Sequence, residues 1–222
     1  MTEHSDNENG PARGLVIAVD GPAASGKGTI ARALADHFGL PHMDTGLLYR
    51  AVALNLWRWG GDPGQEFEAL RACNELSVDF GDPELRSEPV SKIASLVSAY
   101  PSVRTALLER QQQFARQNGG AVLDGRDIGT VVAPKADAKL FVTASAEIRA
   151  RRRHAELVER GMSASFEDVL IDIRSRDERD CGRDAAPLRQ AADAVLIDTG
   201  EMTKTEAIAA AVRGVKQHMV RS

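Results

Sequence analysis

The stretch Gly-Pro-Ala-Ala-Ser-Gly-Lys-Gly-Thr at residues 21–29 indicates the fold of this chain better than any other. Gly21 and Gly26–Lys27 fit the phosphate-loop pattern G-x-x-x-x-G-K. The run Leu15–Asp20 before it is short, apolar and rich in β-branched residues, as a buried parallel strand is. Residues Lys27–Phe38 after it carry apolar side chains at helical spacing. A strand, a glycine turn and a helix in this order bind phosphate through backbone N–H groups and the helix N-terminus.

The whole loop is therefore a candidate site for a nucleotide phosphate chain, with Lys27 as the point charge for the β- and γ-phosphates. The candidate ligands are Gly21, Pro22, Ala23, Ala24, Ser25, Gly26, Lys27, Gly28 and Thr29. The usual motif has Ser or Thr directly after the lysine to hold Mg²⁺. Here Gly28 stands in that place and Thr29 follows, a form that resembles the nucleoside-monophosphate kinases more than the switch GTPases. Thr29 can still contact phosphate or a metal-bound water.

The composition indicates the broad class of protein to which the chain belongs. The 222 residues suffice for one large domain with small inserts, and 43% hydrophobic with 27% charged residues is an ordinary globular balance. A net charge of −4 gives no electrostatic footprint for nucleic acid. Cys73 and Cys181 are isolated and no secretory leader precedes them, so we expect free thiols in the cytoplasm. No apolar run reaches the length of a membrane span, and residues 1–13 are polar, which predicts a disordered tail.

Short apolar runs alternate with helical patterns, which predicts a three-layer α/β/α fold with a five-stranded parallel sheet. The expected strands are Leu15–Asp20, Leu40–Met43, Ala121–Asp124, Ala138–Val142 and Ala194–Ile197. The expected helices are Lys27–Phe38, Gly46–Trp59, Ser91–Ala99, Ser102–Gln117, Ala146–Arg160, Ser165–Asp180 and Lys204–Met219. Residues 60–89 interrupt the alternation of strands and helices, and their sequence predicts a short helix followed by a strand or an irregular arm. We assign Trp57 and Trp59 to packing at a helix end.

Two further segments begin where expected strands end, the edge at which ligands of open parallel sheets gather. In residues 44–50, Arg50 is placed to meet an anion; the alternative is an ordinary helix start with a solvated Arg50. In residues 124–130, Asp124 can hold metal-bound water; the alternative is a polar turn. The arginines between residues 149 and 183 suit phosphoryl transfer, which needs charge neutralisation, although most charge runs are solvated faces.

Together these motifs resemble the bacterial cytidylate kinases, from about Gly14 to the C-terminus. The matching stretches are GPAASGKGT at 21–29, DTGLLYR at 44–50, YPSVRTALLERQQQFA at 100–115, DGRDIGTVVAP at 124–134 and RSRDERDCGRDAAPL at 174–188. The resemblance implies a cytoplasmic enzyme of pyrimidine metabolism, monomeric, that phosphorylates CMP or dCMP from ATP with Mg²⁺ and needs neither nucleic acid nor membrane.

The resemblance also implies roles for individual residues. Cytosine would be read by Ser95, Arg104 and Asp127, and the ribose by Arg176 and Asp180. The acceptor phosphate would meet Arg50, Arg126 and Arg183, and Thr45 and Gly125 would be further substrate contacts. Arg152 and Arg153 would lie in the lid over the transferring phosphoryl group. The expected catalytic residues are Lys27, Arg126, Arg152, Arg153 and Arg183, and the expected metal contacts, through water, are Thr29 and Asp124.

The expected organisation is a single kinase domain over residues 14–222, with an arm that binds the monophosphate over about 60–100 and a lid over about 149–163. The arm is shorter than in long-form members of the family, with only residues 78–85 available for strands. Two alternatives stay open at this point. One is a different phosphate acceptor on the same fold, and the other is a non-enzymatic ATP-binding module. The candidate base-reading trio argues against a small-metabolite acceptor, and Lys27 with the acceptor-side arginines argues against a passive module.

Overall fold

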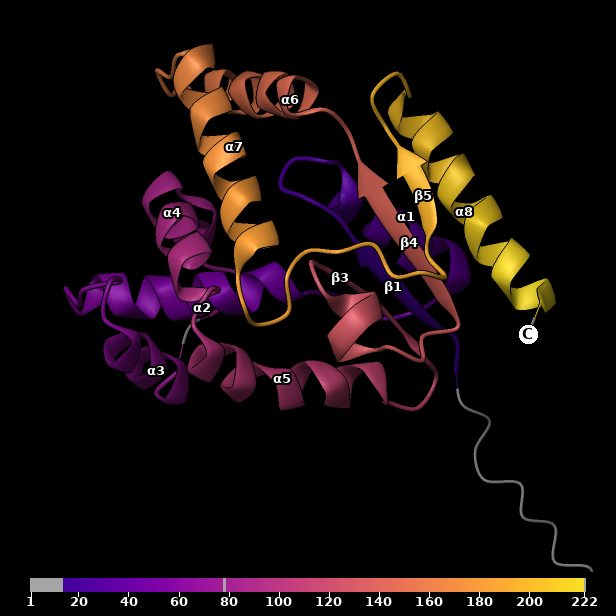
Figure 1. Ribbon diagram of the computed structural model, residues 1–222, viewed down its shortest axis with the longest axis horizontal. Helices are drawn as coiled ribbons and strands as arrows, with labels where there is room; N and C mark the ends of the chain where they lie inside the picture. Colours follow the sequence, from indigo (N-terminus) through magenta and orange to yellow (C-terminus); the bar gives the residue numbers. More distant parts are fainter. Residues whose placement is uncertain (1–13, 78, 222) are drawn as a thin grey trace, which may run out of the picture.

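Five parallel strands form the centre of the computed structural model, in the spatial order β2-β3-β1-β4-β5 (Figure 1). Their bounds are Val16–Asp20 (β1), His42–Asp44 (β2), Ala121–Gly125 (β3), Ala138–Thr143 (β4) and Val195–Asp198 (β5). The structure describes residues 14–77 and 79–221, so the tail predicted over residues 1–13 lies outside the described part. The five predicted strands and the parallel α/β sheet are confirmed.

Alternate residues of β1 face opposite layers of helices. Ile17 and Val19 pack with α1 (Lys27–Phe38) and α8 (Lys204–Arg221) on one face. Val16 and Ala18 pack on the other face, where α5 (Pro101–Ala115) and a π-helical turn, η2 (Ile128–Val132), cover the sheet. Because β1 is buried on both faces, its sequence is a continuous apolar run up to Asp20.

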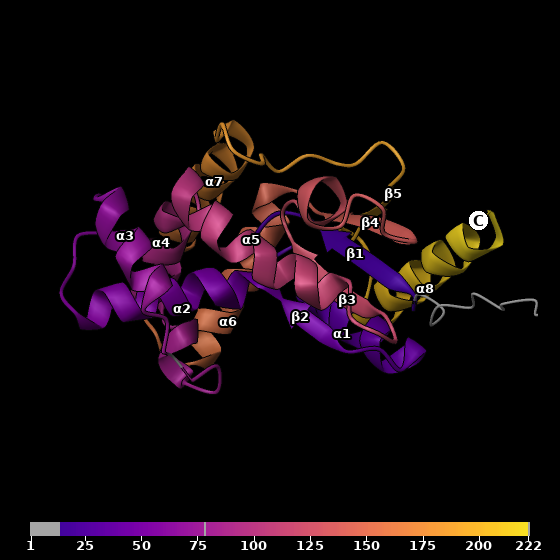
Figure 2. The same cartoon turned by 90° about the horizontal axis from the view of Figure 1, so that it is seen from below.

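A second helical cluster lies beside the sheet (Figure 2). It contains α2 (Thr45–Arg58), α3 (Glu66–Asn74), the 3₁₀ turn η1 (Pro83–Arg86) and α4 (Glu88–Val97), packed against α5. The predicted short helix in this arm is α3, but residues 76, 77 and 79–82 form no strand. Asp79 instead accepts hydrogen bonds from the N–H groups of Gly81 and Asp82 in a local turn.

Helices α6 (Ala146–Glu159) and α7 (Phe166–Gly182) follow β4 and pack on each other through Ala150, Leu157, Val169 and Ile173. Ser145 and Ser165 begin them, each accepting a hydrogen bond from a backbone N–H of the first turn. Ala23 of the glycine loop belongs to the same apolar cluster, so this hairpin lies against the loop. Figure 1 shows α6 beyond the carboxyl end of β4, with α7 facing α4.

Trp57 and Trp59 lie at the end of α2, as predicted, but they are 43% and 44% exposed, so each packs over only part of its surface. The reason is that they lie at the last turn of α2, at the rim of its apolar cluster. Trp59 stacks under the Arg71 guanidinium carbon, 5.2 Å from the ring centre. Over the described residues, no helix has the length and apolar content needed to cross a membrane.

Candidate functional site

The loop between β1 and α1 has the backbone of an anion cradle. Gly21 has φ +154°, and a Cβ there would lie 2.0 Å from the Val142 carbonyl oxygen on β4. Gly26 has φ +89° and begins α1 without a side-chain cap. The N–H groups of an uncapped first turn can bind an anion, and the helix dipole favours its charge.

Lys27 lies at the start of α1 with its ammonium group directed back to the loop, where Nζ donates to the Pro22 carbonyl oxygen at 3.3 Å. Burial and the positive charge of Arg126 lower the pKa of Lys27 to about 7, although the carboxylates of Asp124 and Asp44 oppose this. The site therefore disfavours an uncompensated ammonium charge, and a bound phosphate would supply the missing negative charge.

Asp44 and Asp124 are register partners at the carboxyl ends of β2 and β3. Asp124 Oδ1 lies 2.7 Å from His42 Nε2, and Asp44 Oδ1 accepts from the Gly46 N–H at 3.0 Å. Burial raises the pKa of Asp44, and the negative charge of Asp124 raises it further. Two neighbouring carboxylates in a buried place favour a nearby cation.

Magnesium is compatible with these side chains when nucleotide phosphates complete its ligands. In the described ranges, no three His, Cys, Asp or Glu side chains are grouped as a metal site. Mg²⁺ is commonly held by one or two carboxylates, water and substrate phosphates. Asp124 Oδ2 lies 3.7 Å from the position of a Cβ built on Gly28, so this oxygen faces the start of α1, where Thr29 follows. The donor chemistry thus fits an ion shared with the phosphates.

Asp20 joins the phosphate loop to the segment after β3. Its two carboxylate oxygens accept from the N–H groups of Ile128 and Gly129, each at 2.8 Å. These bonds hold the start of η2, directly after Arg126 and Asp127. Burial raises the pKa of Asp20 to about 6, against the lowering effect of the two N–H groups. Sequence reasoning missed this role because the residue also reads as the last position of a strand.

A cavity of about 50 Å³ lies where α2, α5 and α7 meet the end of β3. All the predicted acceptor-side residues except Ser95 line it. They are Thr45, Arg50, Arg104, Gly125, Arg126, Asp127, Arg176, Asp180 and Arg183. Tyr49 and Ser98 also line it, and neither was among the predicted residues.

Two arginines of this cavity are paired with carboxylates. Arg104 Nη2 donates to Asp127 Oδ2 at 2.5 Å, and Arg126 Nε donates to Asp180 Oδ2 at 2.7 Å. Arg183 lies 3.9 Å from an oxygen of each of these two aspartates. Three guanidinium groups thus share two carboxylates, which leaves the cavity positively charged.

Two buried guanidinium atoms of the cavity have no hydrogen-bond partner in the described part of the chain. They are Arg176 Nε and Arg183 Nη2. Burial and the charge of Arg126 lower the pKa of Arg176 to about 9. Buried donors without a partner are rare and costly, so they indicate that a hydrogen-bond acceptor completes the site. An anionic ligand would satisfy both the donors and the charge.

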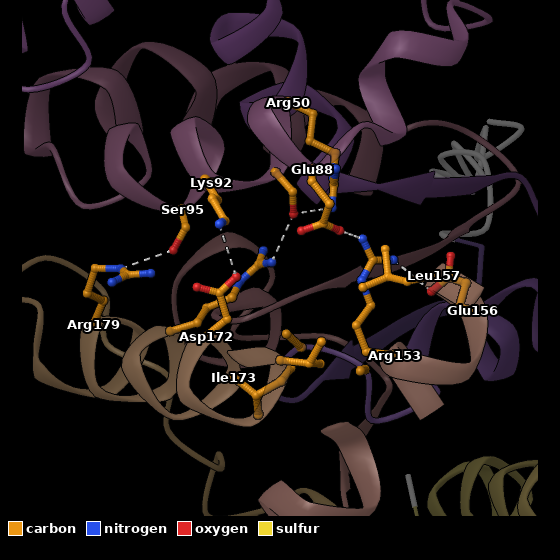
Figure 3. Close-up of a pocket in the computed structure, with 15 residues that line it drawn as sticks. Arg50, Glu88, Lys92, Ser95, Arg153, Glu156, Leu157, Asp172, Ile173 and Arg179 are labelled. Carbon is orange, nitrogen blue, oxygen red and sulfur yellow. Dashed lines mark hydrogen bonds and ion pairs between the residues drawn. The ribbon is translucent and has the colours of Figure 1, made fainter. Parts of the chain in front are cut away.

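Ser95 lines a neighbouring cavity of about 160 Å³ between α4 and the α6–α7 hairpin (Figure 3). Its hydroxyl oxygen accepts from Arg179 Nε at 3.2 Å. Arg50 and Arg176 line both cavities, so the two are adjacent. Arg50 donates to the Leu85 carbonyl oxygen and to Ser91 Oγ, which ties it to the arm.

Arg152 and Arg153, both expected in the lid over the transferring phosphoryl group, line different cavities from neighbouring positions of α6. Arg153 bonds Glu88 of the arm and lines the cavity of Figure 3. Arg152 instead donates to Oγ1 and the carbonyl oxygen of Thr199 at 2.9 and 2.6 Å. Consecutive helical residues are rotated by about 100°, so one helix face does not present both.

Thr199 marks a third cavity, of about 240 Å³, on the other side of the glycine loop. Its lining includes Ser25, Gly26, Thr29, Arg152 and Lys204. Thr199 Oγ1 donates to the Ser25 carbonyl oxygen at 3.0 Å, which ties the end of β5 to the loop. The position of Thr199, two residues after the expected strand Ala194–Ile197, is a signal that sequence reasoning did not use.

Comparison with known proteins follows this geometry. A family model described as cytidylate kinase matches residues 17–217. Proteins named cytidylate kinase from Xanthobacter autotrophicus and Methylocella silvestris are 58% and 54% identical over 89% of this chain, which is 95% and 92% of their lengths. One from a Caulobacter species is 51% identical over 93% of this chain and 96% of its own.

Solved structures support the fold. A gluconokinase from Sinorhizobium meliloti superposes with a TM-score of 0.51 at 16% identity, over 91% of this chain and 92% of its own. A protein from Eubacterium ventriosum, described as uncharacterized, superposes with a TM-score of 0.56 at 13% identity, over 91% of this chain and 98% of its own. At such low identity these similarities concern the fold alone.

Proposed function

The chain belongs to the cytidylate kinase family, and we propose that it transfers the terminal phosphoryl group of ATP to CMP or dCMP, giving ADP and the cytidine diphosphate. One observation carries the proposal beyond the family. A positively charged cavity holds the fixed Arg104–Asp127 pair, and its Arg176 Nε and Arg183 Nη2 lack a hydrogen-bond partner among the described residues. It adjoins the cavity lined by residues 23–24 of the phosphate loop. The side chains of the positively charged cavity match an anion that carries a hydrogen-bonding base, and its volume of about 50 Å³ must widen, by opening of the arm or into the adjoining cavity of about 160 Å³, to admit a nucleotide.

On the donor side, the ATP phosphates lie in the loop of residues 21–29, with Lys27 at the β- and γ-phosphates. The uncapped start of α1 and the unusual backbone at Gly21 support this placement. The adenosine enters the cavity lined by Arg152, Thr199 and Lys204, which adjoins the loop at Ser25 and Gly26.

On the acceptor side, Asp127 and Arg104 read the base. Cytosine offers an amino donor at N4 and acceptors at N3 and O2, which match the Asp127 carboxylate and the Arg104 guanidinium. Ser95 lines the adjoining cavity, and its hydroxyl oxygen accepts from N4 in the bound complex. Uracil has a carbonyl oxygen where cytosine has its amino group, so it would face the Asp127 carboxylate unfavourably.

The sugar and phosphate of the acceptor extend from the base toward the glycine loop. Arg176 and Asp180 bind the ribose, and Thr45 and Gly125 are further substrate contacts. Arg50, Arg126 and Arg183 bind the acceptor phosphate. Arg183 Nη2, which has no hydrogen-bond partner among the described residues, and the charges around Arg126 support this arrangement.

The reaction needs no general base, because the acceptor phosphate is already an anion near neutral pH. Lys27, Arg126, Arg153 and Arg183 position the two phosphates and neutralise the charge that spreads over the transferring group. Asp124 and Thr29 would hold Mg²⁺ through water, and the ion would supply further charge neutralisation. The lid, over about residues 149–163, carries Arg153 in the middle of α6, and the segment around α3 and α4 acts as the arm. Their closure excludes water that would hydrolyse ATP.

An assay of ADP formation with CMP, dCMP, UMP and AMP as separate acceptors tests the proposal. We expect fast turnover with CMP or dCMP and much slower turnover with UMP and AMP. Preference for another acceptor would replace the substrate assignment, and ATP binding without turnover of any nucleotide would refute the proposed activity.

A further inference from the structure

Building on the proposed function, we propose that the ion pair between Arg149 of α6 and Asp177 of α7 is a positioning device. It ties the glycine loop that holds the donor to the helix that carries the acceptor residues. Through it, binding of ATP raises the affinity of the enzyme for CMP.

The pair is two-pronged and largely buried. Arg149 Nη1 and Nη2 donate to Asp177 Oδ1 and Oδ2 at 2.9 and 2.6 Å, and the Arg149 side chain is 5% exposed. Arg149 Nε also donates to the Ala144 carbonyl oxygen at 2.9 Å, at the end of β4. A planar guanidinium held at both edges has one orientation, so it fixes its partners with respect to one another.

One of these partners belongs to the donor site. Arg149 Nη1 donates to the Ala23 carbonyl oxygen at 3.3 Å, inside the glycine loop. In a trans peptide the carbonyl and the following N–H point in opposite directions, so this bond directs the Ala24 N–H away from Arg149. Ala24 has φ +57°, a left-handed conformation that an alanine adopts at some cost. Arg149 thus stabilises the loop in a shape with the Ala23 oxygen turned out of the way of a phosphate.

The other partner belongs to the acceptor side. Asp177 follows Arg176 directly and is three residues before Asp180 on α7, and Arg183 caps the end of the same helix. Fixing Asp177 therefore sets the axial position and the rotation of the helix that presents these groups to the acceptor cavity. When a bound donor orders the glycine loop, the loop fixes the orientation of Arg149. Arg149 then fixes the position of α7, and α7 places its acceptor-binding side chains in the cavity.

A second ion pair between the same two helices provides a matched control. Arg174 Nη2 donates to Glu147 Oε1 at 2.8 Å, but these side chains are 57% and 46% exposed. The bonds described for Arg174 and Glu147 do not reach the glycine loop. If any link between α6 and α7 sufficed, loss of this pair would have the same effect as loss of Arg149–Asp177.

The test measures CMP affinity by titration calorimetry, with and without a saturating non-hydrolysable ATP analogue, in wild type, Asp177→Asn, Arg149→Met, Arg149→Lys and Arg174→Gln. For the wild type we expect the analogue to tighten CMP binding by about fivefold or more, the lower end of typical coupling between sites. Asp177→Asn and Arg149→Met reduce that factor to below twofold and raise the KM for ATP. Arg149→Lys retains part of the tightening of CMP binding by the analogue, and Arg174→Gln leaves that tightening at the wild-type value. The Asp177→Asn, Arg149→Met double variant is no worse than either single variant, because both remove the same link.

Circular dichroism and thermal unfolding establish which variants fold; should Arg149→Met not fold, Asp177→Asn and Arg149→Lys decide the matter. The proposal is overturned if folded Asp177→Asn keeps the wild-type coupling, if Arg174→Gln loses as much, or if wild type shows no coupling. A wild type that binds ATP but neither binds nor phosphorylates CMP refutes the proposed function instead. The donor side is then still tested by the ATP affinity of Asp177→Asn.

Discussion

Arg104 Nη2 and Asp127 Oδ2 lie 2.5 Å apart, and both side chains are buried. Arg104 also donates to the Ser98 carbonyl oxygen, and its guanidinium carbon lies 5.5 Å from the centre of the Tyr49 ring. The pair therefore holds a donor edge and an acceptor oxygen side by side before any ligand arrives. A preorganised edge of this kind can distinguish bases that differ in one donor and one acceptor.

We expect Asp127→Asn to narrow the preference for CMP over UMP. The asparagine amide can donate to the uracil O4 oxygen, whereas its single oxygen serves the cytosine amino group less well. The kcat/KM for CMP should fall by about a hundredfold and that for UMP should fall less or rise, in a comparison with Glu178→Gln, an exposed change on α7. An unchanged CMP to UMP ratio would show that Asp127 does not read the base.

Replacing Lys27 should separate catalysis from folding. Lys27→Ala removes the positive charge at the donor phosphates, and we expect kcat to fall by at least about a hundredfold. The fold should persist, because the ligand-free site disfavours that charge and Lys27 has a pKa of about 7. Circular dichroism and steady-state kinetics measure the two effects, with exposed Lys216→Ala on α8 as the control. Near-normal turnover would overturn the role of Lys27.

ATP binding should take up a proton at alkaline pH. The pKa of Lys27 in the ligand-free protein is about 7, below the ordinary 10.5, and bound phosphate restores the charged form. At pH 8.5 the phosphates are already ionised, so calorimetry in buffers of different ionisation enthalpy should report uptake of nearly one proton in wild type. Lys27→Met should show almost none. Equal uptake in both proteins would contradict this origin of the proton.

The same pKa sets a direction for stability. Between pH 7 and 10.5 the unfolded chain keeps the Lys27 proton that the ligand-free folded state has lost. The contribution of Lys27 to the free energy of unfolding therefore rises with pH in this window.

Asp20→Asn should destabilise the fold by about 1–3 kcal/mol, because its amide group places a donor against the N–H of Ile128 or Gly129. Burial raises the Asp20 pKa to about 6 from 3.8, so the folded state holds a proton that the unfolded chain has lost between these values. The contribution of Asp20 to stability thus falls as pH rises through the window, and the variant should lack this slope. Urea unfolding at pH 4–7, beside exposed Asp36→Asn, measures both effects. A variant as stable as wild type would show that the bonds from Asp20 to Ile128 and Gly129 do not stabilise the fold.

Much of the fold was predictable from the sequence because its signals are local. The strand β1 is an apolar run that ends at Asp20, and α1 begins after the glycine loop, at the predicted Lys27. The arm was not predictable in the same way. The alternation around Phe80 is typical of a strand, but a strand needs a partner, and the turn at Asp79 forms instead.

The sequence predicted which residues gather at the candidate site better than it predicted their contacts with one another. Arg50 and Arg126 lie in the segments that follow β2 and β3, and they line one cavity because parallel strands end at one edge. Arg183, at the end of α7, was assigned from the resemblance. The separation of Arg152 from Arg153 and the bond from Arg179 to Ser95 depend on how α6 and α7 pack on their neighbours. No local pattern encodes such packing.

The central claim is that the donor loop and the acceptor cavity are two ends of one cleft. An analogue with cytidine and adenosine joined by five phosphates tests this directly, because it fills both ends at once. Calorimetry should give one molecule per chain with an affinity well above that of ATP or CMP, and kinetics should show competition with both substrates. Competition with only one substrate, or binding no tighter than ATP alone, would contradict the account.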